Sequence, residues 1–131
     1  MSTIIALIAA AVTFGTVLMY GTLGEVLTER SGNLNLGVEG IMFMGGAFGL
    51  GGVFYYEQAV GEANSSAAVA LLIAIGAAFA AGAFASLIFS FLTITLRANQ
   101  NVTGLALTIF GTGVGQFTGE YMRVRQGGYV A

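Results

Sequence analysis

The side chains best suited to binding a polar molecule gather in one short stretch of this sequence. Asn33 and Asn35 stand two residues apart, Leu34 and Leu36 alternate with them, and Glu39 follows. In an extended segment, this alternation directs the amides to one side and the leucines to the other. The pattern predicts an extended strip that is either an ordinary surface loop or a row of amides that contacts a solute in a transport pathway.

Glu39 lies at the start of an apolar run, where ionisable side chains are costly and often mark a transport pathway. The structural alternative is a carboxylate in the first turn of a helix, where it interacts favourably with the helix N-terminus. We expect Glu39 to hold the preceding segment by accepting hydrogen bonds there. A second polar cluster, Asn99, Gln100 and Asn101, either lines the same pathway or forms a turn between two helices.

The other residue types exclude most catalytic chemistry. The sequence contains no Asp, Lys, His or Cys, so thiol chemistry, histidine acid–base catalysis and soft-metal sites are not expected. Glu25 and Glu29 share one helical face, which is the usual arrangement at a solvated helix end. No basic patch indicates nucleic acid as a partner. We therefore expect neither an enzyme nor a metal site nor a cofactor.

The composition indicates which elements must position these residues. Hydrophobic residues make up 56% of the 131 residues and charged residues 8%. Soluble proteins carry about 25% charged residues, and ten charges cannot cover a chain of this length with polar surface. The sequence therefore predicts an integral membrane protein that is surrounded by lipid. Because lipid requires every backbone group to be paired within the protein, we expect helices.

Uncharged runs define the expected helices. A span needs about 20 apolar residues, and four segments qualify, near 3–24, 37–56, 67–96 and 102–119. They predict an all-α membrane chain with one domain over residues 1–131 and a break rich in Gly and Asn between the first two helices. The start lacks the charged region of a signal peptide, so we expect the first segment to be retained as a spanning helix.

The arginines give conflicting evidence on orientation. Arg30 and Arg97 lie in the first and third connections, while the second connection holds Glu57 and Glu62 without an arginine. The positive-inside rule then places the first and third connections in the cytoplasm and both termini outside. Arg123 and Arg125 in the tail contradict this topology. Either the second or the fourth segment does not cross fully, or four arginines are too few to decide.

Glycines at helical spacing indicate close helix packing. Small residues on one face let helix backbones approach each other in a membrane. Such a stripe serves either static packing or a moving seam in a transporter. The two rows are Gly45, Gly49 and Gly52 in the second segment, and Gly111, Gly115 and Gly119 in the fourth.

Two long motifs resemble a known transporter family. The stretch GEVLTERSGNLNLGVEGIMFMGG (24–46) is similar to the N-terminal signature of permeases in the superfamily of ABC importers for branched-chain amino acids, ribose and nucleosides. The stretch TLRANQNVTGLALTIFGTGVGQF (95–117) is similar to a second signature of the branch that handles nucleosides or simple sugars. The resemblance implies that the break near Gly32 to Gly40 faces a translocation path near mid-membrane.

The resemblance also implies partners and a location. A permease of this family works with a separate ATP-binding subunit that hydrolyses ATP, a second permease subunit and an extracytoplasmic solute-binding lipoprotein, in the bacterial inner membrane. The chain covers less than half of the family's usual length and lacks the basic ATPase-docking loop, so we expect the N-terminal portion of a longer permease. The alternatives are a small dimeric four-helix exporter that exchanges protons through Glu39, and a non-transporting membrane helper or partial gene product.

Overall fold

The computed structural model describes residues 2–61 and 64–126, which form an all-helical chain. No strand occurs within these two ranges, and the prediction of an all-α chain with about four hydrophobic helices is confirmed. The elements are α1 (Ser2–Arg30), α2 (Val38–Val60), α3 (Ala67–Ser90), the π-helical turn η2 (Phe91–Thr95) that continues α3, and α4 (Gln100–Gln126).

Three helical stretches of the described chain are long and apolar enough to cross a membrane. They are Thr3–Arg30, Val38–Val60 and Ala67–Thr95. The fourth helix, α4, has 27 residues but is less apolar, because threonines, glycines and glutamines interrupt its hydrophobic residues. The described chain is therefore a multi-pass membrane protein whose last helix is the most polar of the four.

The helices extend beyond the uncharged runs that predicted them. α1 continues through Glu25 and Glu29 to Arg30, and α4 begins at Gln100 and continues past Arg123. Charges mark where a helix leaves lipid, whereas the helix itself ends where its backbone hydrogen bonds end. The hydropathy pattern therefore located the helices correctly but placed several ends too early or too late.

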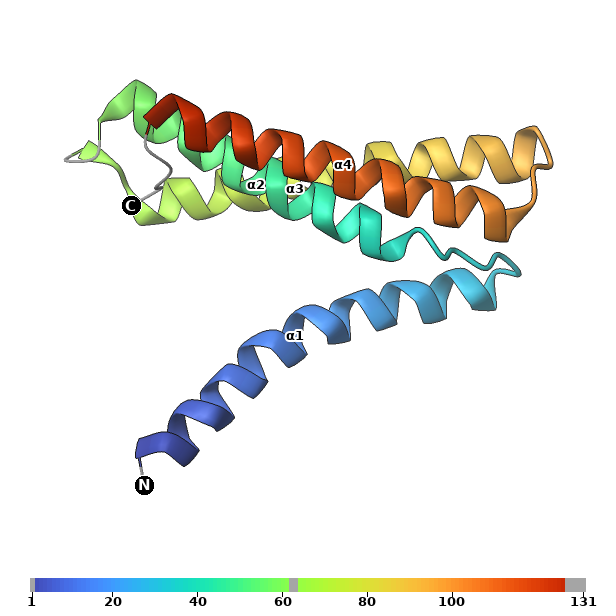
Figure 1. Ribbon diagram of the computed structural model, residues 1–131, viewed down its shortest axis with the longest axis horizontal. Helices are drawn as coiled ribbons and strands as arrows, with labels where there is room; N and C mark the ends of the chain where they lie inside the picture. The colour runs from blue at the N-terminus through green and yellow to red at the C-terminus, as the bar shows by residue number, and fades with distance from the viewer. Residues whose placement is uncertain (1, 62–63, 127–131) are drawn as a thin grey trace.

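Helices α2, α3 and α4 form a bundle, and α1 diverges from it (Figure 1). α2 packs against both α3 and α4, whereas α1 meets α2 only near its own C-terminal end. Every residue from Thr3 to Tyr20 is exposed, and only Gly21, Glu25 and Thr28 of α1 are half-buried. The bundle is thus one packed unit, and α1 is an apolar helix that lies beside it with few contacts.

Glycines set how closely the bundle helices approach. A Cβ atom on Gly49 would lie 3.0 Å from the Ala74 carbonyl oxygen of α3, and one on Gly45 or Gly52 would also contact α3. On α4, a Cβ atom on Gly111 would meet the Gly40 backbone. A Cβ atom on Gly115 would meet the Phe43 ring, whereas one on Gly119 would have no atom within 4 Å. Gly119 therefore does not face α2, although α4 continues to contact α2 as far as Met122, whose Sδ would lie 3.8 Å from a Cβ atom on Gly51.

Alternate helices run in opposite directions (Figure 1), which explains the conflict among the arginines. α1 and α3 end where α2 and α4 begin, so the 31–37 break and the 96–99 connection lie at the same end of the molecule. Arg30 and Arg97 belong to that end, and Arg123 and Arg125 belong to the other. Two arginines at each end leave the positive-inside rule without a preferred orientation.

Candidate functional site

The break begins with a helix-ending hydrogen-bond pattern at the last turn of α1. The Asn33 backbone N–H donates to the Thr28 carbonyl oxygen at 3.2 Å, and the Gly32 N–H donates to the Glu29 carbonyl oxygen at 2.9 Å. Gly32 has a φ of +86°, a left-handed conformation that glycine adopts without strain. These bonds form a Schellman motif. Gly32 therefore stops α1 and starts the extended strip.

Asn35 is the most buried polar residue of the break, with 7% of its surface exposed. Its Oδ1 accepts a hydrogen bond from the Gly37 N–H at 2.9 Å, and its own backbone N–H donates to Glu25 Oε1 at 3.1 Å. Gly37 is needed at this point because a Cβ atom there would lie 2.9 Å from Asn35 Oδ1. Asn35 Nδ2 makes no hydrogen bond within the described ranges.

Gln100 joins the break to the start of α4. Its Nε2 donates to Asn33 Oδ1 at 3.1 Å, and its Oε1 accepts from the Leu34 backbone N–H at 2.8 Å. Both ends of one side-chain amide are thus used on two consecutive residues that lie 66 and 67 positions away in the sequence. Gln100 therefore makes a specific contact, and it is more than part of an ordinary turn.

The first turns of α4 support the rest of the break. Thr108 Oγ1 donates to the Leu36 carbonyl oxygen at 2.8 Å. A Cβ atom on Gly104 would lie 2.7 Å from the Leu36 backbone nitrogen, so a glycine is required for this approach. The sequence analysis placed later glycines of this helix in a small-residue row, but it did not predict that the start of α4 meets the break. The only available signal was that two polar stretches occur in the sequence, separated by α2 and α3.

The other two residues of the second polar cluster have different positions. Asn99 caps α4, because its Oδ1 accepts hydrogen bonds from the backbone N–H groups of Asn101 at 3.0 Å and Val102 at 3.2 Å. Asn101 is exposed, and its side chain makes no hydrogen bond within residues 2–61 and 64–126. Of the three candidates, Gln100 alone contacts the break.

A carboxylate does hold the break, but it is Glu25 and not the expected Glu39. Glu39 lies exposed in the first turn of α2, and its carboxylate has no hydrogen bond or ion pair with any described residue. Glu25 is half-buried on α1, and its Oε2 is buried without a hydrogen-bond partner in the described chain. The sequence interpretation of Glu25 as part of a solvated helix end missed this contact.

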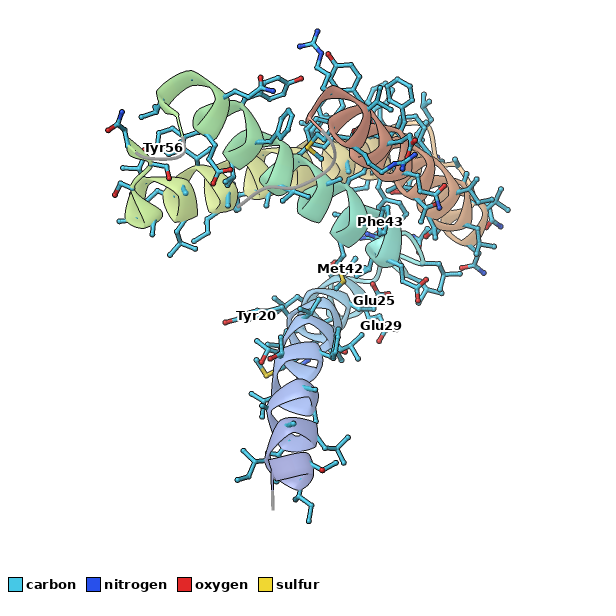
Figure 2. The ribbon with its side chains drawn as sticks, turned by 60° about the vertical axis from the view of Figure 1, so that its left-hand side comes forward. Tyr20, Glu25, Glu29, Met42, Phe43 and Tyr56 are labelled. Carbon is cyan, nitrogen blue, oxygen red and sulfur yellow. The ribbon has the colours of Figure 1, made fainter. Side chains whose placement is uncertain are left out.

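Two hollows lie beside the break, and each is lined by one of its two asparagines. A groove of about 480 Å³ lies between α1 and the bundle, and Tyr20, Gly21, Asn35 and Met42 are among its lining residues. Figure 2 shows Met42 at this junction, with Tyr20 and Glu25 on α1. The second hollow has about 320 Å³ and is lined in part by Asn33, Ser31, Ser90 and Thr93. Thr28 lines both hollows, so they share one wall of α1.

A third hollow differs in chemistry. It has about 370 Å³, lies between the α3–η2 end and α4, and is lined mainly by apolar side chains such as Phe89, Leu92, Leu107 and Phe110. Thr103 is its single polar lining residue within the described chain. This hollow suits a hydrocarbon chain, whereas the two hollows at the break offer polar groups.

The break lies at the end of the bundle. The resemblance implied a position near mid-membrane, and the structure differs from this expectation. The hydrogen bond between Gln100 and Asn33 puts it level with the 96–99 connection. α2 has 23 residues and is therefore about 34 Å long, enough for a hydrocarbon core of about 30 Å. Because the whole of α2 lies on one side of the break, the geometry favours a position near one membrane surface.

Similarity to known proteins is consistent with this architecture. TsgC13 of Haloferax volcanii, provisionally named a glucose ABC transporter permease protein, is 38% identical over 114 residues, which cover 87% of this chain and 31% of that protein. The guanosine ABC transporter permease protein NupQ of Bacillus subtilis is 33% identical over 111 residues, which cover 85% of this chain and 33% of that protein. The chain thus spans about a third of the length of these relatives. No solved structure matches it significantly.

The family match extends over nearly the whole chain. Residues 5–128 match the family described as the permease component of the branched-chain amino acid transport system. This range includes both motifs of the sequence analysis, the break and all of α2, α3 and α4. The chain therefore belongs to the permease family of branched-chain amino acid transport systems, and it resembles ABC permeases named for a sugar and a nucleoside.

Proposed function

We propose that this chain forms the N-terminal membrane domain, residues 1–131, of a permease subunit in an ABC importer for nucleosides or simple sugars. The names of the two relatives, for glucose and guanosine transport, support this solute class. Family membership favours the importer over a small proton-exchanging exporter and over a non-transporting helper.

The observation that carries the proposal is the position of Asn35. The residue is 7% exposed and lines the groove between α1 and the bundle. Its Nδ2 makes no hydrogen bond within the described ranges and is not among their fully buried unpaired atoms, so it is a donor that a hydrogen-bond acceptor in the groove can reach. A solute that enters the groove supplies one. Asn33 in the neighbouring hollow has the same role, and the break forms one mouth of the pathway.

The packing suggests how the groove opens and closes. The bundle holds the break through Gln100, Gly104 and Thr108, whereas α1 is joined to the break by the turn at Gly32 and by the hydrogen bond of Glu25. Further back along α1, Gly21 faces Met42 of α2. Movement of α1 about this turn changes the width of the groove, while the contacts with the bundle hold the break. The chain performs no covalent chemistry, and its contribution is alternating access to the two sides of the membrane.

The proposal includes the other parts of an importer. A separate ATP-binding subunit hydrolyses ATP, a second permease subunit completes the pathway, and a solute-binding lipoprotein delivers the solute from outside the cell. The location is the bacterial inner membrane. Within residues 2–61 and 64–126, no cluster of acidic, His or Cys side chains could hold a metal ion.

Reconstitution tests the function. The complete permease that contains this chain is inserted into proteoliposomes with its ATP-binding subunit, its second permease subunit and its solute-binding lipoprotein, and uptake of radiolabelled guanosine and glucose is measured. The proposal expects uptake of at least one solute with ATP and none with a non-hydrolysable ATP analogue. ATP hydrolysis without accumulation of either solute would count against the assigned solute class. Failure to purify with any ATP-binding subunit would count against the importer itself.

A further inference from the structure

The orientation of the Gln100 amide is determined by a backbone group. The Leu34 backbone N–H can only donate, so the end of the Gln100 amide that lies 2.8 Å from it must be the oxygen. The other end of the same amide is then the NH2 group, 3.1 Å from the Asn33 side chain. An NH2 group can only donate, and the Asn33 atom that faces it must therefore be Oδ1.

These two hydrogen bonds, from Leu34 to Gln100 and from Gln100 to Asn33, form a relay. The relay determines which end of the Asn33 side-chain amide remains available for other hydrogen bonds. With Oδ1 bound to Gln100, Nδ2 is the remaining end of the Asn33 amide, and its sole hydrogen bond within the described residues is a long one of 3.5 Å to Ser31 Oγ. Asn33 lines the hollow of about 320 Å³. Its donor end is therefore the group available there.

Asn35 has the same polarity for an independent reason. The Gly37 backbone N–H donates to Asn35 Oδ1 at 2.9 Å, which leaves Nδ2 as the free end in the groove of about 480 Å³. Two fixed backbone N–H groups, at Leu34 and Gly37, thus orient both asparagines. Each hollow receives a hydrogen-bond donor from the break.

We propose that Gln100 is a positioning residue that fixes the Asn33 amide with its NH2 group outward, so that the break binds solutes through their acceptor oxygen or nitrogen atoms. The inference rests on the proposed function and specifies the chemistry of recognition at the same site. The matching ligand class is a solute with several acceptor atoms and no ammonium or guanidinium group, because those cations offer only donors. Asn99 and Asn101, on the same turn as Gln100, make no hydrogen bond to Asn33 within the described chain.

Gln100→Glu is expected to reverse the orientation of the Asn33 amide while a hydrogen bond between residues 33 and 100 is kept. The carboxylate still accepts from the Leu34 N–H, but it repels Asn33 Oδ1 and favours the flipped amide, with Nδ2 toward residue 100. Asn33 then offers an acceptor to the hollow. Asn33→Asp also places an acceptor oxygen in the hollow, because it replaces the NH2 group of Asn33 directly. Asn101→Asp is the matched control, because it adds the same charge on the same turn, at an exposed side chain without a hydrogen bond.

The experiment measures guanosine uptake by the complete permease reconstituted with its ATP-binding subunit, second permease subunit and solute-binding lipoprotein. For Gln100→Glu and Asn33→Asp, we expect KM to rise about tenfold, as for the loss of one hydrogen bond, with the maximal rate within about twofold of wild type. Asn101→Asp is expected to match wild type. Unchanged KM values for both test variants, or an equal rise for Asn101→Asp, would overturn the proposal.

A second measurement separates this inference from the proposed function. Thermal unfolding of the complete permease in detergent is compared for Asn33→Ala, Gln100→Ala and the double variant. If the relay exists, the double variant loses no more Tm than the more damaging single variant. Additive losses would overturn the relay whether or not guanosine is transported. If the wild type transports neither guanosine nor glucose, the proposed function fails, and this cycle still decides on the relay.

Discussion

Gly111 of α4 lies directly against the backbone of Gly40 in α2. A Cβ atom on Gly111 would overlap the Gly40 carbonyl group, and one on Gly40 would lie 2.5 Å from Thr108 Cα. This contact holds the start of α4 against the start of α2, and the same turns of α4 support the break. The geometry of the candidate site therefore depends on a glycine pair outside it.

Gly111→Ala is expected to destabilise the bundle, because its neighbours are backbone atoms that cannot rotate away. Insertion of a methyl group into a packed interface costs about 1–3 kcal/mol. Gly113→Ala is the control, since a Cβ atom there would meet no atom within 4 Å. That substitution should stabilise the helix by roughly 0.5–1 kcal/mol. Thermal unfolding in detergent measures both, and equal effects would contradict the contact.

Gly115 and Gly119 should respond differently to the same substitution. A Cβ atom on Gly115 would meet the Phe43 ring, whereas one on Gly119 would have free space. Gly115→Leu should therefore separate α4 from α2 and reduce the yield of folded protein, and Gly119→Leu should be tolerated. Size-exclusion chromatography after membrane extraction provides the readout. A folded, monodisperse Gly115→Leu variant would show that α4 does not pack as described.

Loss of the Glu25 carboxylate should loosen the break. Glu25→Ala leaves the Asn35 backbone N–H without its acceptor, and an unpaired buried donor costs about 1–3 kcal/mol. We expect hydrogen exchange at the Asn35 amide to become about tenfold faster or more, in proportion to that loss. Glu29→Ala is the control, because Glu29 is exposed one turn away. The same acceleration in both variants would argue against a specific role of Glu25.

The helix directions predict which residues share one side of the membrane. Because the sequence has no Cys, single cysteines can be introduced without background labelling. Ser31→Cys and Asn101→Cys should react with a membrane-impermeant maleimide from the same side, since both residues lie at the end of the molecule that contains the break. Arg125→Cys should react from the opposite side. Reaction of all three from one side would show that α4 does not cross.

Hydropathy was sufficient to predict the helices, because apolar runs of about 20 residues have few alternatives in lipid. The break between α1 and α2 was predictable for a similar reason, since Gly32 and the adjacent polar residues cannot continue an apolar span. Pairing across the fold was not predictable. Nothing in the local pattern distinguishes Gln100 from Asn99 or Asn101, and helix α3 had to be placed before Gln100 could meet Asn33.

The position of the carboxylates explains why Glu25, and not the expected Glu39, holds the break. Glu39 is in the first turn of α2, a position that favours an acidic residue in any helix, and its side chain is exposed. Glu25 is ten residues before Asn35, and only the Schellman turn at Gly32 folds the chain back far enough for the two to meet. Charge and position in the sequence alone favoured the wrong carboxylate.

The central claim is that the break lines the solute pathway, and Asn35→Asp tests it most directly. This variant keeps an oxygen that can bind the Gly37 N–H and removes the free N–H donor, so the contact with Gly37 is retained. The measurement is the KM of guanosine uptake by the complete permease with its ATP-binding subunit, with Asn101→Asp as the control of equal charge. The account predicts a KM that is at least about tenfold higher for Asn35→Asp, with unchanged membrane insertion, subunit association and control kinetics. Wild-type uptake kinetics for Asn35→Asp would contradict it and return residues 31–37 to the role of a surface loop.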